Sequence, residues 1–123
     1  MLDNAALNYM VDQLLNKTYT MRLHTSDPGA GGGNEVETSG QKGYARPSIL
    51  PSQWPSAAAG DADNNTAFSF GTATANWSGA ITHVTMWDGS TRYGKWALGS
   101  PKTILSGQEA LIAAGAFDFD IDP

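Results

Sequence analysis

The side chains best suited to chemistry are two histidines and two glutamates, and their spacing forms no catalytic constellation. His24 and His83 fall on stretches that alternate as strands do, and no Gly-x-Ser-x-Gly elbow accompanies them. We expect both histidines to be hydrogen-bonded structural groups. Glu35 and Glu37 could form the carboxylate pair of a small hydrolase, but they lie in a polar stretch that would not raise either pKa. The sequence therefore predicts no catalytic residues and no enzyme.

Two acidic segments place oxygen ligands at alternate positions, as calcium loops do. The segment 61–65 has this spacing but lacks the sixth-position glycine and the twelfth-position glutamate of a calcium loop. Three further acids would share one face of a strand: Asp118, Asp120 and Asp122. A solvated turn and a solvated edge strand are the simpler interpretations. The glycines at 29–33 lack the Lys–Ser/Thr pair of a phosphate loop and precede no helix pattern. We therefore predict no metal and no cofactor.

The composition excludes several classes of protein. The 123 residues carry 7 basic and 12 acidic side chains, for a net charge of −5, and no cysteine. A disulfide scaffold and a thiolate zinc site are thereby excluded, and the negative charge argues against nucleic acid as a partner. No apolar run is long enough to span a membrane, and the acidic N-terminus does not look like a signal peptide. The length predicts a single domain over residues 1–123.

The elements that would carry these side chains are one helix and a set of short strands. Residues 3–16 predict an amphipathic helix with Asp3 as its N-cap, on an apolar stripe of Leu7, Met10, Val11, Leu14 and Leu15. From residue 18 to 122 the pattern alternates. About seven short strands are expected there, among them an edge strand at 44–50, a central strand at 80–87 that is covered on both sides, and a hairpin into 92–98. Pro101 is expected to begin a further strand at 102–105. In the closing strand at 116–121, Phe117, Phe119 and Ile121 are expected to point inward and the aspartates outward. We expect a mainly β protein, an antiparallel sandwich or barrel, with long loops at 28–43 and 51–65.

The four tryptophans divide into expected core and expected surface. Trp87 and Trp96 lie on strand patterns and are expected in the core. Trp54 stands between two prolines in an irregular stretch, where we expect it at a contact surface.

Several phrases, in order along the chain, resemble a family of small virion structural proteins of tailed bacteriophages. They are LHTSDPGAGGGNEV at 23–36, GYAR at 43–46, ATANW at 73–77, ITHVTMWD at 81–88 and the closing pattern from 96 to 119. Family members are described as tail-fibre, minor tail or head-decoration proteins. The resemblance implies a non-enzymatic protein, made in the bacterial host cytoplasm and built into the virion. It also implies a homo-oligomer, with a trimer among the states common in such appendages.

Within that resemblance, a capsid position is slightly favoured over a tail position. The chain has no coiled-coil heptads or fibrous repeat, so it would make a poor fibre shaft by itself. We therefore expect a capsid decoration or cementing protein that binds the major capsid protein. The alternative is a tail-fibre, minor tail or baseplate protein that contacts tail proteins and could bind host glycans through exposed tryptophans. The residues expected at a protein interface are Gly31, Gly32, Asn34, Glu35 and Trp54.

Overall fold

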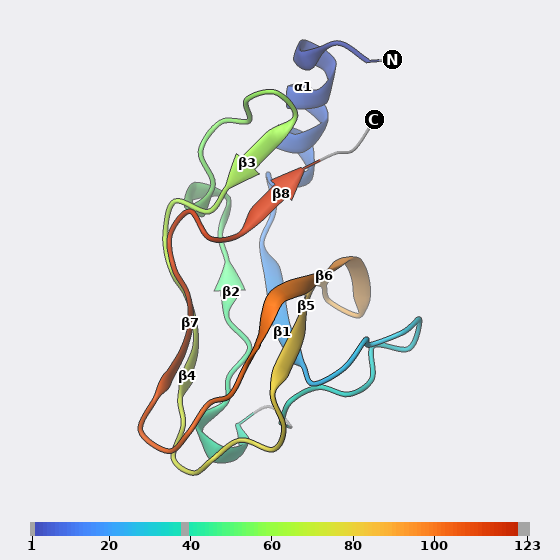
Figure 1. Ribbon diagram of the computed structural model, residues 1–123. Helices are drawn as coiled ribbons and strands as arrows, with labels where there is room; N and C mark the ends of the chain where they lie inside the picture. The colour runs from blue at the N-terminus through green and yellow to red at the C-terminus, as the bar shows by residue number, and fades with distance from the viewer. Residues whose placement is uncertain (1, 38–39, 121–123) are drawn as a thin grey trace. The chain divides into compact units, whose positions relative to one another are not determined.

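A computed structural model describes residues 2–37 and 40–120 (Figure 1). The expected mainly β protein with one N-terminal helix is confirmed. The helix is α1 (Asn4–Leu14), and the strands are β1 (Tyr19–His24), β2 (Ser48–Ile49), β3 (Asp61–Asp63), β4 (Phe68–Thr72), β5 (Ile81–Asp88), β6 (Thr91–Lys102), β7 (Glu109–Ile112) and β8 (Asp118–Asp120). Two short 3-10 turns, η1 (Gln41–Gly43) and η2 (Pro51–Gln53), interrupt the loops. The strands form one four-stranded sheet, in the order β2-β1-β5-β6, and two pairs, β3-β8 and β4-β7.

The chain divides into two compact units. Unit 1 contains residues 1–18, 49–68 and 112–123, and unit 2 contains residues 19–48 and 69–111. The expectation that residues 1–123 form a single domain stays a prediction.

In unit 1, α1 covers the β3 segment through its apolar stripe (Figure 1). Leu7, Val11 and Leu15 are buried, and Asp12 accepts a hydrogen bond from the Ala57 backbone N–H at 2.8 Å. The helix is shorter than the expected 3–16. Asp3 occupies the N-cap position, but its side chain makes no capping hydrogen bond.

The core of unit 1 is an aromatic cluster. Trp54 lies edge-on to Phe68, Phe117 and Phe119, with ring centroids 5.8, 5.9 and 6.3 Å away. The inward alternation expected for Phe117 and Phe119 is confirmed, since both are buried. The same expectation for Ile121 and Asp122 lies outside the described residues. Because large aromatic side chains bury much apolar area, this cluster contributes strongly to the hydrophobic core of the unit.

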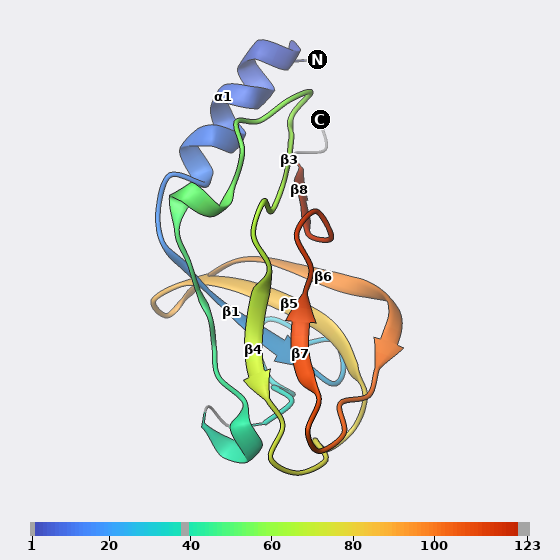
Figure 2. The same ribbon diagram turned by 90° about the vertical axis from the view of Figure 1, so that its left-hand side faces the viewer.

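In unit 2, β5 lies between β1 and β6, as the second view of the ribbon shows (Figure 2). Met21 pairs with Met86 across β1 and β5, and both are fully buried on one face of the sheet. Thr85 and Trp87 are buried on the other face. The expectation that residues 80–87 form a central strand covered on both sides is therefore confirmed.

Three of the expected boundaries are wrong. We expected Pro101 to begin a new strand at 102–105, but β6 continues from the hairpin turn through Pro101 to Lys102. Proline is tolerated there because β6 is an edge strand, where a missing N–H breaks no ladder bond. The expected loop 51–65 contains η2 and β3, because Asp61–Asp63 pairs with the distant β8. The expected edge strand at 44–50 is reduced to the two residues of β2, which does lie at the sheet edge.

Candidate functional site

The glycine-rich segment 27–37 of unit 2, which we call the glycine loop, is closed within its tip and bound to β1 near its end. Within the tip, the Gly33 N–H donates to the Pro28 carbonyl at 3.0 Å. Near the end, the Val36 N–H donates to the Leu23 carbonyl at 2.9 Å, and Glu35 forms an isolated antiparallel bridge with His24. The loop is therefore an ordered extension beside β1, although it contains no strand of its own.

A chain of buried hydrogen bonds joins this loop to the sheet. The Trp87 indole N–H donates to the Thr85 hydroxyl at 2.6 Å, and Thr85 Oγ1 lies 2.8 Å from His24 Nε2. His24 Nδ1 lies 2.8 Å from the Gly33 carbonyl oxygen. A carbonyl can only accept, so His24 donates from Nδ1 and accepts the Thr85 hydroxyl proton at Nε2. Burial lowers the pKa of His24, which favours this neutral form. The expected structural role of His24 is confirmed.

His83 is the other candidate histidine, and it also makes a structural hydrogen bond. One of its ring nitrogens, Nδ1, lies 2.8 Å from the hydroxyl of the neighbouring Thr82. The expected hydrogen bond of His83 is therefore present, while its structural role stays a prediction.

Gly32 lets the loop lie directly on the Trp87 ring. A Cβ atom built at Gly32 would stand 2.8 Å from two carbons of that ring, closer than side chains approach each other. Gly32 also has a φ of 70°, in the left-handed region that favours glycine. Gly31, one residue earlier, is exposed and has open space around it. The two neighbouring glycines therefore have different roles: Gly32 contacts the sheet and Gly31 faces solvent.

Two charged contacts tie the start of the loop to β6. Lys95 Nζ lies 2.8 Å from an Asp27 carboxylate oxygen, and the Arg92 guanidinium donates to the Gly29 carbonyl. The Lys95 ammonium, together with the Gly29 N–H, lowers the pKa of Asp27 to about 2. Both side chains of the pair are substantially exposed, so solvent screens the ion pair and it contributes little to stability. It positions the loop more than it stabilises the fold.

Glu35 and Glu37 do not form a carboxylate pair for hydrolysis, because each is bound by other residues. Glu35 accepts from the Tyr44 hydroxyl at 2.6 Å and from Arg46 Nε and Nη2 at 2.9 and 2.6 Å. Burial acts to raise the pKa of Glu35, but the hydrogen bonds from Arg46 and Tyr44 outweigh it and lower the pKa. Glu37 accepts from the Ser78 N–H at 2.9 Å, which lowers its pKa as well. Both glutamates therefore stay ionised.

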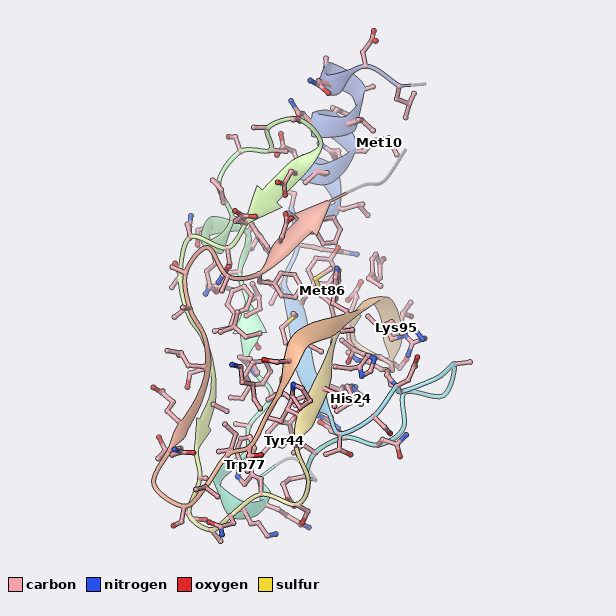
Figure 3. The ribbon with its side chains drawn as sticks, in the orientation of Figure 1. Met10, His24, Tyr44, Trp77, Met86 and Lys95 are labelled. Atoms are coloured by element: carbon pink, nitrogen blue, oxygen red, sulfur yellow. The ribbon has the colours of Figure 1, made fainter. Side chains whose placement is uncertain are left out.

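Tyr44 connects this ion pair to the interior of unit 2. Its hydroxyl accepts from the Leu23 N–H at 3.1 Å while donating to Glu35, and its ring packs edge-on against Trp77 at 5.5 Å (Figure 3). Burial and the Glu35 carboxylate raise the pKa of Tyr44. Sequence reasoning missed this residue as an anchor, because its partners lie far along the chain.

The residues expected at an interface differ in how far they can reach a partner. Gly31 and Asn34 are exposed at the loop tip, Gly32 is half-buried against Trp87, and Glu35 is half-buried in its ion pair. Our expectation that Trp54 lies at a contact surface is wrong. Only 7% of it is exposed, because the aromatic side chains of unit 1 surround it. The loop positions stay predictions for an interface, whereas the Trp54 ring lies inside its own unit.

The other tryptophans are also largely enclosed. Trp77 and Trp87 are buried, which confirms the expectation for Trp87. Trp96 is half-buried rather than in the core, with its ring lying over Gly94 of the same strand.

The two acidic segments meet in unit 1. Asp61 and Asp63 lie on β3 and Asp118 on β8, and one carboxylate oxygen from each lies within 4.8 Å of the others. A hydrogen bond with Asp61, followed by burial and by Asp63, raises the pKa of Asp118 to about 7. Three carboxylates could contact a cation, but calcium takes six to eight oxygen ligands. We assign no metal to this cluster.

This fold is an antiparallel β scaffold that carries an ordered surface loop. The sequence model of the family described as "Podophage GP4 fiber I protein gp80" matches residues 1–120 of the chain. The chain therefore belongs to this family of bacteriophage fiber proteins, and the expected membership of a tailed-phage virion structural family is confirmed. Its role is structural and its place is the virion. No curated protein matches the chain. Within the described residues, no helix is long and apolar enough to cross a membrane.

Proposed function

We propose that this protein is a non-enzymatic component of the fiber apparatus of a tailed phage, and that its glycine loop contacts a neighbouring virion protein. The observation that carries the proposal is the match of a fiber family over residues 1–120. It favours a tail-fiber position over the capsid decoration that the absence of fibrous repeats suggested. Binding to the major capsid protein stays the alternative.

The geometry of the glycine loop supports its role in assembly. His24 holds Gly33 and the Trp87 ring lies against Gly32, while the neighbouring Gly31 and Asn34 are exposed. A surface that is already ordered loses little conformational entropy when a partner binds. The absence of a catalytic role is proposed because the side chains best suited to chemistry are all engaged in hydrogen bonds or ion pairs: His24, His83, Glu35 and Glu37.

The position in the particle is tested by copy number and by labelling. Quantitative mass spectrometry of purified virions should find few copies relative to the major shell protein, and antibody labelling should mark the tail. A ratio near one copy per shell subunit would overturn the fiber position in favour of capsid decoration. Absence of the protein from purified particles would overturn a virion role.

The role of the loop is tested by a substitution at its exposed tip. Gly31→Arg should leave the fold intact, because nothing lies within 4 Å of a Cβ at that position. We expect it to reduce incorporation into particles in an infection complemented with the variant gene. Ser56→Arg is the control, since Ser56 is exposed and is not part of the loop. Normal incorporation of both variants would exclude the loop as a contact.

A further inference from the structure

Strand β6 has an open edge. It is the last strand of the four-stranded sheet and pairs with β5 on one side; among the described strands, none pairs with its other side. Its 12 residues make it about twice as long as a mean strand. The backbone N–H and C=O groups along such an edge can hydrogen-bond to a further strand.

Only the middle of β6 has the regular geometry that another strand needs. Residues 94–97 pair with His83–Met86 without interruption, and irregularities lie on both sides of this run. Tyr93 is the extra residue on one side, because Arg92 pairs with Trp87 and Gly94 with Met86. A segment added at this edge would therefore pair with residues 94–97.

The two faces of this edge offer different chemistry. Lys95 and Arg92 lie opposite Thr85 and Trp87, so the bulge places both cations on the same face of the sheet. Trp96 lies on the other face, above Gly94. An added strand would therefore meet positive charge at one set of alternate positions and apolar or aromatic surface at the other.

The charge of β6 also disfavours pairing with another copy of itself. The strand carries Arg92, Lys95 and Lys102 and no acidic residue. Two β6 edges side by side would bring like charges together, which opposes pairing. The contact between Lys95 and Asp27 is exposed and weak, so the carboxylate of a partner could replace it.

We propose that the open edge of β6 accepts an extended segment of another protein in which acidic and apolar residues alternate. The acidic side chains would face Arg92 and Lys95, and the apolar ones would pack beside Trp96. This inference goes beyond the proposed function, because it holds wherever in the virion the protein lies.

The test uses the full chain and a synthetic, end-capped peptide of alternating aspartate and valine, followed by NMR. We expect the peptide to shift the backbone amides of residues 94–97 and to slow their hydrogen exchange. A peptide of alternating lysine and valine should not do so. The absence of shifts, or shifts without slowed exchange at these residues, would overturn strand addition.

Charge reversal separates the proposed contact from general attraction. Lys95→Glu should weaken binding of the aspartate peptide about tenfold, since a favourable charge pair becomes a repulsive one. It should also allow the lysine peptide to bind. Lys17→Glu changes the net charge equally but lies outside β6, so it should have little effect. Equal weakening by both variants would overturn the charge match at β6.

Analytical ultracentrifugation of the chain alone tests whether a second copy of the chain, rather than an acidic segment, binds the β6 edge. We expect no self-association through β6. A dimer that forms with rising concentration and that changes with Lys95→Glu would show that a second copy, rather than an acidic segment, occupies the edge, and would overturn the proposal.

Discussion

The imidazole Nε2 of His24 lies 2.8 Å from the hydroxyl of Thr85, and this contact makes the anchoring of the glycine loop depend on the central strand. His24 belongs to β1 and Thr85 to β5, and both are fully buried. The opposite ring nitrogen of His24 holds Gly33 at the end of the loop tip. The side chain of His24 therefore binds the sheet and the loop at the same time, so the position of the loop depends on that of the sheet.

We predict that Thr85→Val destabilises the protein by about 1–3 kcal/mol, because it leaves His24 Nε2 and the Trp87 indole N–H buried without their partner. Urea unfolding followed by circular dichroism measures the change. Hydrogen exchange of the Gly33 amide, which donates to the Pro28 carbonyl, should also accelerate as the loop loosens. Thr91→Val, at an exposed position of β6, is the control and should change the stability little. An unfolding midpoint equal to that of the unchanged protein would refute the role given to Thr85.

The two neighbouring glycines of the loop should respond differently to the same substitution. Gly32→Ala forces a methyl group toward the Trp87 ring and imposes a left-handed φ on alanine. We expect a loss of about 1–2 kcal/mol and a changed tryptophan fluorescence spectrum. Gly31→Ala has open space and no positive φ, so its stability should match that of the original chain. If both variants behave alike, the close approach of the loop to Trp87 is wrong.

The position of Trp54 predicts a stability defect rather than a binding defect. Trp54→Ala removes the ring at the centre of the aromatic cluster of unit 1 and should cost about 3–5 kcal/mol. Trp54→Phe keeps an aromatic side chain there and should cost less. Thermal unfolding of the purified variants measures both. A fully stable Trp54→Ala protein that fails to assemble would instead support the surface role expected from the sequence.

The acidic cluster predicts a pH dependence of stability with an unusual sign. The pKa of Asp118 is about 7 in the folded chain, against an ordinary value of 3.8. Between these values the folded state binds more protons than the unfolded state, so stability should fall as the pH rises from about 4 to 7.

Asp118→Asn removes this titration. The variant should lose that component of the pH dependence and should be more stable than the original chain at pH 8, where the three carboxylates repel one another. Unfolding curves at a series of pH values compare the two proteins, and an NMR titration of the Asp118 carboxyl gives its pKa. Identical pH profiles, or an Asp118 that titrates near 4, would contradict the prediction.

The elements predicted well are those with a strong local pattern. The apolar stripe of α1 and the alternation of β5 each continue over several residues, so both elements could be predicted, although Met10 of the predicted stripe is exposed. The glycine loop was recognised as a long polar segment, but its contacts were not. Asp27 and Lys95 are 68 residues apart, and no local signal connects them.

Short elements escaped prediction because they have no period to detect. Strands β3 and β8 have three residues each and pair across more than 50 positions, so only their pairing identifies them. The same distance explains why the acidic segments, which looked like two separate solvated stretches, form a single cluster.

The mainly β class, the N-terminal helix and the central strand could be predicted from the sequence alone, because they follow from local periodicity and composition. The burial of Trp54, the contact of Gly32 with Trp87 and the ion pair of Glu35 with Arg46 became apparent only in the folded chain. Burial and pairing depend on side chains brought together from distant parts of the chain. Their free energy arises from that assembly, so no short stretch of sequence contains it.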